Sequence, residues 1–202
     1  MGSIISYCHI KENKILKDGA MILEHPEIPL DDFMLEAFST LIITYPKFYK
    51  MDRLSKLGFL ASEILLQEES IKNNDGSVAV VLSNSNSSLD TDIRFWEGTK
   101  KQASPSLFVY TLPNIVIGEI CIRHRLKGEN IFFISPEFDS NLIFNYAELL
   151  INSGKADRCL AGWINVLGEQ ADVFLYLAER ATGQQLDHNP KKILELYHSW
   201  NN

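Results

Sequence analysis

One acidic residue, Glu137, occupies the position in this chain that is best placed for chemistry. An apolar strand is expected at 131–135 and a helix at 139–153, so a sharp turn presents the Glu137 carboxylate near a helix N-terminus. The helix dipole stabilises a carboxylate there by about 0.3 to 1 kcal/mol. Burial would raise the pKa of Glu137 toward neutrality and permit general acid or base catalysis. A helix-capping role in an unrelated α/β domain and a catalytic role therefore both remain open.

The other residues of types that often take part in catalysis are not accompanied by a recognisable set of partner residues. The run Asp187-His188-Asn189 has the composition of a small catalytic cluster, but it precedes Pro190 and is better explained as a turn into the last helix. His9 and the remaining histidines outside 123–125 are expected to be surface residues or satisfied polar residues. No second catalytic group stands at a convincing distance from Glu137.

Strands that alternate with helices are expected to position Glu137. We expect strands at 3–9, 78–82, 131–135, 158–164 and 171–180, and helices at 30–44, 51–68, 89–101, 114–125, 139–153 and 191–200. A polar, irregular segment up to about residue 28, a turn at 73–76 and a loop at 104–113 complete the chain. The pattern predicts a single α/β domain over 1–202 with a five-stranded, mostly parallel core sheet and helices on both faces.

Composition restricts the class of protein. The chain has 202 residues, 46% hydrophobic, which suffices for a sizeable core. Its net charge of −7 and its lack of a basic stripe argue against nucleic acid or an anionic membrane as the main partner. We expect a cytoplasmic protein without a membrane span. Cys8, Cys121 and Cys159 lie far apart and lack histidines at ligand spacing, so we expect reduced, mostly buried thiols and no metal site.

Three ordered blocks resemble the N-terminal half of a β-ketoacyl synthase, which has the thiolase-like fold. The first block is 50–58 (KMDRLSKLG), the second runs through 104–108, 112–114, Gly118 and 123–128, and the third comprises 147–154, 156–157 and 160–162. The family's spacing is kept without a gap from Gly128 to Gly162, and the likeness extends loosely from about residue 40 to residue 181. Ordered blocks at fixed spacing are harder to obtain by chance than single short motifs.

The resemblance implies a protein that is catalytically inactive alone. In that family the position of Glu137 holds the nucleophilic cysteine that carries the acyl chain as a thioester, and a carboxylate cannot replace it in carbon–carbon bond formation. The small polar run 83–88 stands where these synthases usually carry a glycine-rich turn. The family's second half, which supplies two catalytic histidines or a histidine and an asparagine, is expected to be missing.

The resemblance also implies a function. The chain is similar to chain length factors, which pair with an active synthase and shape the tunnel in which the product grows, and in particular to the short form of the aryl polyene and flexirubin pathways. It would form a heterodimer with a full-length β-ketoacyl synthase and meet acyl carrier protein. It would bind no cofactor itself and act on phosphopantetheine-linked acyl chains. A homodimer of the isolated protein is also compatible with this resemblance.

The residues expected at the tunnel wall or the subunit interface are bulky and mostly apolar: Leu89, Ile93, Phe95, Trp96, Leu112, Ile117, Cys121, Phe132, Phe133 and Phe138. Phe95 and Trp96 are adjacent, so on a helix they point about 100° apart and one of them should lie at an interface. The apolar, uncharged strand at 131–134 would be an aggregation hazard at an exposed sheet edge. The resemblance implies that this strand pairs with its counterpart across a dimer.

Two further interpretations come from other classes of protein. The first is a stand-alone decarboxylase or hydrolase in which Glu137 is the catalytic acid or base. The second is a homodimeric protein that binds acyl carriers without a synthase partner.

Overall fold

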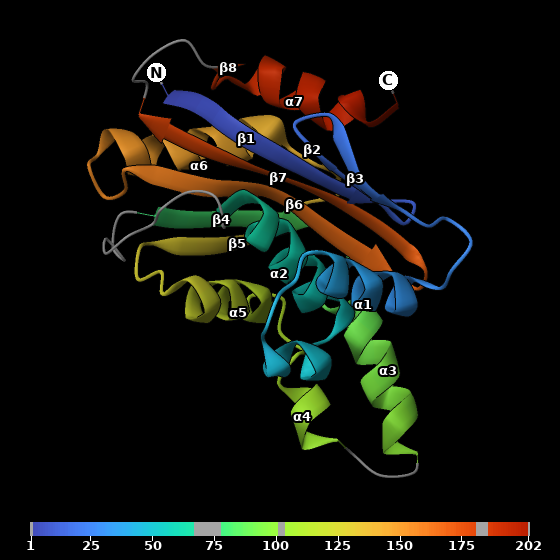
Figure 1. Cartoon of the computed structure of the whole chain (residues 1–202). Coiled ribbons are helices and arrows are strands. Elements are labelled where there is room, and N and C mark those ends of the chain that lie inside the picture. Colours follow the sequence, from blue (N-terminus) through green and yellow to red (C-terminus); the bar gives the residue numbers. More distant parts are fainter. Residues whose placement is uncertain (1, 67–77, 101–103, 181–185, 202) are drawn as a thin grey trace.

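The computed structural model describes residues 2–66, 78–100, 104–180 and 186–201 (Figure 1). The strands are β1 (Gly2–Lys11), β2 (Lys14–Lys17), β3 (Ala20–Glu24), β4 (Val78–Asn84), β5 (Asn130–Ile134), β6 (Arg158–Leu167), β7 (Gln170–Arg180) and β8 (Leu186–Asp187). The α-helices are α1 (Leu30–Thr40), α2 (Arg53–Leu66), α3 (Leu89–Thr99), α4 (Pro105–Phe108), α5 (Ile115–His124), α6 (Ser140–Asn152) and α7 (Pro190–His198). Two short 3₁₀ helices are η1 (Pro46–Lys50) and η2 (Ser199–Asn201).

All the described strands belong to one sheet, in the order β3-β2-β1-β7-β6-β4-β5, with β8 paired to β1. Strand β4 is parallel to both β5 and β6, whereas β7 is antiparallel to both β6 and β1. Strands β1, β4, β5 and β6 therefore run in one direction, and β7 alone opposes them within this core. The predicted five-stranded, mostly parallel core is confirmed, and three short antiparallel strands extend it.

The irregular segment that the sequence predicted before residue 28 is instead the ribbon of β2 and β3, so that prediction was wrong. Both connections are two-residue turns in which each residue has a positive φ: 50° and 52° at Glu12 and Asn13, and 51° and 82° at Asp18 and Gly19. These angles match the turns that suit the twist of a β-hairpin. Asp-Gly is a strong hairpin signal, and it was present in the sequence.

Helices cover both faces of the sheet, as predicted (Figure 1). On one face α1, α2, η1 and α5 enclose a core that contains Phe33, Phe48, Phe59 and Ile120. On the other face α6 and α7 enclose a core that contains Ile143, Phe174, Tyr176 and Ile193. None of the helices in the described part of the chain is long and apolar enough to cross a membrane.

Side-chain hydrogen bonds fix α7 against the second face. Asn189 caps the helix, because its side-chain oxygen accepts a bond of 2.8 Å from the Lys192 N–H. The Tyr197 hydroxyl donates to Asp172 at 2.6 Å. His188, buried before the helix, lies 2.8 Å from a carboxylate oxygen of Glu148. Asp187 ends strand β8 and pairs with Ser3, so the prediction of a turn over 187–189 was wrong at that residue, whereas His188 and the cap residue Asn189 lead directly into the last helix as predicted.

Some predicted boundaries differ from the structure. Helix α1 ends at Thr40 rather than at 44, and the expected loop at 104–113 contains the short helix α4. Strand β6 continues to Leu167, three residues beyond its predicted end. The turn predicted at 73–76 and the end of the helix predicted at 51–68 lie outside the described residues.

Candidate functional site

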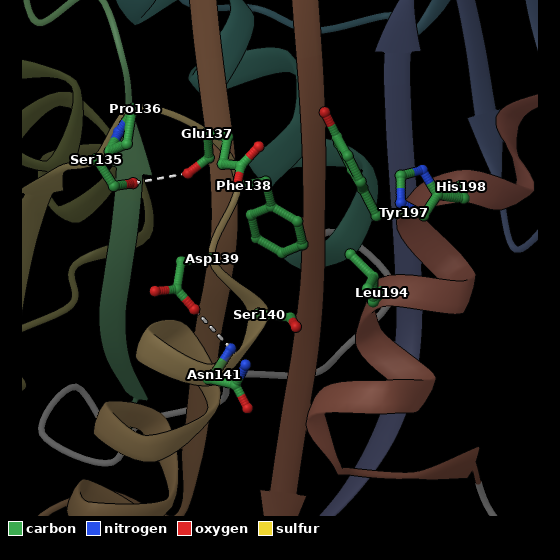
Figure 2. Close-up of a pocket in the computed structure, with 10 residues that line it drawn as sticks. All are labelled: Ser135, Pro136, Glu137, Phe138, Asp139, Ser140, Asn141, Leu194, Tyr197 and His198. Atoms are coloured by element: carbon green, nitrogen blue, oxygen red, sulfur yellow. Dashed lines mark hydrogen bonds between the residues drawn. The ribbon is translucent and has the colours of Figure 1, made fainter.

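Glu137 lies in the turn between β5 and α6, beyond the carboxyl ends of the parallel strands (Figure 2). The Ser135 N–H donates to the Asn84 carbonyl at 2.9 Å, which holds the end of β5 beside the end of β4. The Ser135 hydroxyl donates to the Glu137 carbonyl, also at 2.9 Å, and shapes the turn. Ligands of open α/β sheets usually bind at this edge. The predicted arrangement of strand, turn and helix is therefore confirmed.

The N-terminus of α6 is capped by Asp139 and not by Glu137. One carboxylate oxygen of Asp139 accepts bonds of 3.0 Å from the N–H groups of Asn141 and Leu142. Glu137 stands two residues before this cap, and its side chain is exposed. Of the two roles left open for Glu137, helix capping is therefore filled by Asp139, and Glu137 is not buried. An aspartate just before a helix is itself a cap signal, so the sequence offered this alternative.

A cavity of about 690 Å³ adjoins the turn. Figure 2 shows that residues 135–141 form one side and that Leu194, Tyr197 and His198 of α7 form the other. Phe138 is buried at its base, where its ring contacts those of Trp163, Phe174 and Tyr197. The lining contains two exposed carboxylates and no thiol. Covalent acyl transfer through a thioester therefore has no nucleophile in this cavity.

The small polar run 83–88 makes a turn that its own side chains hold. The Asn84 side chain donates to the Ser87 carbonyl at 2.8 Å and accepts from the Ser87 N–H at 2.9 Å. The Ser88 hydroxyl donates to the Thr111 carbonyl at 2.9 Å. Side-chain bonds of this kind replace backbone bonds in tight turns. They explain how the chain turns here without the glycines expected from the resemblance.

Gly162, the last residue of the third resembling block, is required by the packing of β6 on β7. Its φ is +146°, and a Cβ atom there would overlap the carbonyl oxygen of Phe174 on the neighbouring strand. Only glycine fits where two backbones approach this closely.

Helix α3 presents an exposed apolar surface formed by Leu89, Ile93 and Trp96, whose side chains are 42%, 44% and 69% exposed. These residues recur at helical spacing and share one face. Phe95 points elsewhere and packs against Phe108, with 5.4 Å between ring centroids. The expected divergence of Phe95 and Trp96 is therefore observed.

The other predicted tunnel or interface residues divide by burial. Leu112 is exposed, whereas Ile117 is buried in the first core. Cys121 packs against that core, and burial raises the pKa of its thiol to about 11. Phe138 is buried in the second core. Ile117 and Phe138 contact this chain's own core, and Phe138 also lines the Glu137 cavity, so the roles predicted for both residues at a tunnel wall or interface stay predictions.

Strand β5 is the last strand in the sheet order, so one of its edges faces no strand in the described part of the chain. Phe132 packs toward the first core, and Phe133 packs toward the second, 5.4 Å from the Tyr146 ring. Ile134 is 54% exposed at the end of the strand. The expected edge position of this apolar strand is confirmed.

Solved structures of three assemblies are similar to this chain. A chain of the ishigamide ketosynthase/chain length factor superposes with a TM-score of 0.69 at 18% identity, over 91% of this chain and 63% of that one. A chain of AntDE:AntF, a type II polyketide synthase acyl-carrier protein in complex with its ketosynthase, gives 0.62 at 13% identity, over 89% and 62%. A chain of the complex of the ketosynthase ApeO with its chain length factor ApeC from Xenorhabdus doucetiae gives 0.58 at 13% identity, over 98% and 90%.

The chain thus spans less than two thirds of the length of the first two neighbours and most of the third. No protein-family model matches the sequence. No curated protein matches it either. At these identities the likeness concerns the fold. Together with the strand order, it shows that the chain has the thiolase-like fold of ketosynthases and chain length factors.

Proposed function

We propose that this chain is a non-catalytic, chain-length-factor-like subunit that pairs with an active β-ketoacyl synthase in fatty-acid or polyketide biosynthesis of the aryl polyene type. The observation that carries the proposal is the uncharged edge of β5, which pairs with no other strand among the described residues, on a thiolase-like fold. The similar structures include a ketosynthase in complex with its chain length factor and an acyl-carrier protein in complex with its ketosynthase, which supports the proposed partners.

The edge of β5 is equipped to receive another strand. The Val80 N–H donates to the Glu129 carbonyl, and the Ser135 N–H donates to the Asn84 carbonyl, so these residues face β4. Because the direction alternates along a strand, the main-chain groups of Phe132 and Ile134 point away from β4. An apolar edge of this kind invites pairing with another chain. A strand of the synthase partner would satisfy these groups and cover Ile134.

The α3 surface supplies a second contact. Leu89, Ile93 and Trp96 form an apolar stripe on α3, and Phe108 and Leu112 are further exposed apolar residues later in the chain. Large aromatic side chains are enriched in protein interfaces, and exposed apolar patches often mark them. In the proposed complex this stripe would contact the synthase or close its acyl tunnel.

Condensation would take place in the partner. The Glu137 cavity offers carboxylates in place of a thiol, so this chain would contribute tunnel wall and interface, with no cofactor of its own. The growing chain would stay on the phosphopantetheine of the acyl carrier protein or on the cysteine of the synthase. A cytoplasmic location belongs to the same proposal.

Co-expression with the full-length synthase of the same genome tests this proposal. We expect a one-to-one complex in size-exclusion chromatography with mass determination. Ile134→Lys should weaken the complex, because it places a charge on the edge of β5, whereas Leu35→Lys on α1 should not; both side chains are partly exposed in the isolated chain.

A protein that elutes alone with every synthase of its genome would refute the proposal, as would full complex formation by Ile134→Lys. In that case a decarboxylase assay of Glu137→Gln would test the stand-alone alternative. Loss of activity in that variant would assign Glu137 a catalytic role.

A further inference from the structure

A second cavity, of about 660 Å³, lies between the β1–β2–β3 ribbon and the end of the chain. Its walls include Tyr7 and His9 from β1, Leu16 from β2, Met21 from β3, and Ser199 and Trp200 from η2. No lining residue is shared with the Glu137 cavity. Figure 1 shows the C-terminal end of α7 beside β2 and β3.

His9 gives this cavity an unused hydrogen-bond acceptor. Its side chain is only 3% exposed, and its Nε2 atom has no hydrogen-bond partner among the described residues. Burial lowers the pKa of His9 to about 4, although the neighbouring main chain of Tyr197 and Leu196 acts to raise it. The ring is therefore neutral at pH 7, and Nε2 is a hydrogen-bond acceptor in the tautomer that carries its proton on Nδ1. A buried polar atom without a partner is rare and calls for an explanation.

Flat and apolar groups surround this acceptor. The ring centroids of Trp200 and Tyr7 lie 5.9 Å and 5.8 Å from that of His9. Leu16 pairs with His9 on one side and with Met21 on the other, so the three side chains form one row across the ribbon. Apolar walls with a few fixed polar groups are the usual composition of small-molecule sites.

The charges at the rim favour a neutral ligand. Lys14 lines the cavity, but its ammonium group lies 2.6 Å from the Glu24 carboxylate, which compensates its charge. Glu12, the other charged residue in the lining, would repel an anion. A buried neutral imidazole likewise offers no charge to pair with a ligand.

We propose that this cavity binds an uncharged, planar, hydroxyl-bearing ligand of the phenol class. Its O–H group would donate to His9 Nε2, and its ring would lie between Trp200 and the row formed by Leu16 and Met21. Because Nε2 has no solvent-exposed surface, the Trp200 ring, whose centroid is 5.9 Å from that of His9, would shift to admit the ligand and then pack against it. Trp200 is in the short terminal turn η2, where the Ser199 hydroxyl bonds the Leu196 carbonyl at 2.7 Å.

Two probes of nearly the same shape test the proposal. We would titrate the full chain with p-cresol and with toluene, and follow calorimetry, tryptophan fluorescence and the imidazole ¹⁵N resonances of His9. A hydrogen bond to Nε2 should make p-cresol bind about 5- to 10-fold more tightly than toluene. The His9 Nε2 resonance and the fluorescence of Trp200 should both shift on saturation.

Two variants distinguish the contribution of the His9 hydrogen bond from that of the apolar cavity walls. His9→Phe should keep toluene binding and lose the preference for p-cresol, whereas Trp200→Ala should weaken both probes. Trp96→Ala, which changes an exposed tryptophan on α3, is the matched control and should change neither.

Four results would overturn the proposal: no saturable binding of either probe, equal affinities, a p-cresol preference that survives in His9→Phe, or an unchanged Nε2 resonance. The last result would mean that p-cresol does not bond to this atom. It can be obtained from the unmodified chain, so the test does not depend on the folding of His9→Phe.

Discussion

Replacing Ile42 by glycine should raise the free energy of unfolding by about 1 kcal/mol. Helix α1 ends in a Schellman motif, in which the Ile42 N–H bonds the Ser39 carbonyl at 3.0 Å and the Ile43 N–H bonds the Phe38 carbonyl at 3.4 Å. The motif requires a left-handed residue at Ile42, where φ is 53°. Glycine is usual at this position, and a β-branched residue there is an outlier.

The magnitude follows from opposing contributions. The left-handed conformation costs an L-residue about 1 to 2 kcal/mol, and β-branching adds to that cost. Glycine removes this strain but loses about 0.5 to 1 kcal/mol through the greater entropy of the unfolded chain. The Ile42 side chain is 89% exposed, so its removal sacrifices little burial. For a chain of this size a gain of about 1 kcal/mol corresponds to a rise in Tm of about 2 to 4 °C.

Helix α6 offers the matched control. It ends in the same motif with Gly154 at the left-handed position, where φ is +74°, and the Lys155 N–H bonds the Leu150 carbonyl at 3.0 Å. A Cβ atom at Gly154 would meet nothing within 4 Å, so Gly154→Ala should cost about 1 kcal/mol through backbone strain. The two substitutions should therefore change stability in opposite directions.

Urea unfolding of both variants and the unmodified chain would measure these changes. Ile42→Ala, which removes the side chain but keeps a Cβ in the left-handed conformation, separates strain from side-chain loss. If Ile42→Gly lowered stability while Gly154→Ala behaved as expected, the reasoning would be refuted, because the Ile42 side chain would then have to make a stabilising contact.

Three further results are expected. Burial lowers the pKa of His9 to about 4, whereas the pKa in the unfolded chain is about 6.5. The free energy of unfolding should therefore fall by about 3 kcal/mol through His9 as the pH drops from above 6.5 to 4. In urea unfolding at both pH values, His9→Phe should remove this share of the pH dependence. Arg123→Ala should destabilise the chain by about 3 kcal/mol in thermal unfolding, because the Glu63 side chain is 2% exposed and loses its two hydrogen bonds of 2.6 and 2.9 Å to Arg123. The double variant Glu63→Gln, Arg123→Met leaves no unpaired buried charge and should recover most of that stability. Trp96→Ala should change the free energy of unfolding by no more than about 0.5 kcal/mol, since the side chain is 69% exposed. The same variant should weaken the proposed synthase complex at least about 10-fold in a binding titration. An unchanged affinity would show that α3 is not part of the interface.

The core of the sheet was predictable because its signals are local and strong. Val78 to Leu82 is a continuous apolar run, and in the structure every residue of β4 is buried between two helical layers. The apolar, uncharged residues of β5 likewise indicated a strand that needs cover. The ribbon of β2 and β3 was missed because lysines begin and end the short strand β2, which hides its alternation. The turn residues Asp18 and Gly19 were the better signal.

The function of individual residues in the Glu137 turn was harder to predict. Glu137 and Asp139 are both acidic, and which of them caps α6 depends on the residue at which the helix begins. Helix boundaries are uncertain by one or two residues even when the helix itself is obvious. The structure starts the helix at Ser140, which gives the cap to Asp139 and leaves Glu137 exposed.

His9 shows what a sequence cannot provide without the fold. Alternation along β1 places it on the same face as Tyr7, but its burial depends on α7, which returns from the far end of the chain to cover that face. Helix α7 also supplies Leu194, Tyr197 and His198 to the Glu137 cavity, and η2, directly after it, supplies Ser199 and Trp200 to the His9 cavity. One C-terminal segment thus forms a wall of both cavities. The bond between Tyr197 and Asp172, which holds this segment on the sheet, therefore contributes to the shape of each.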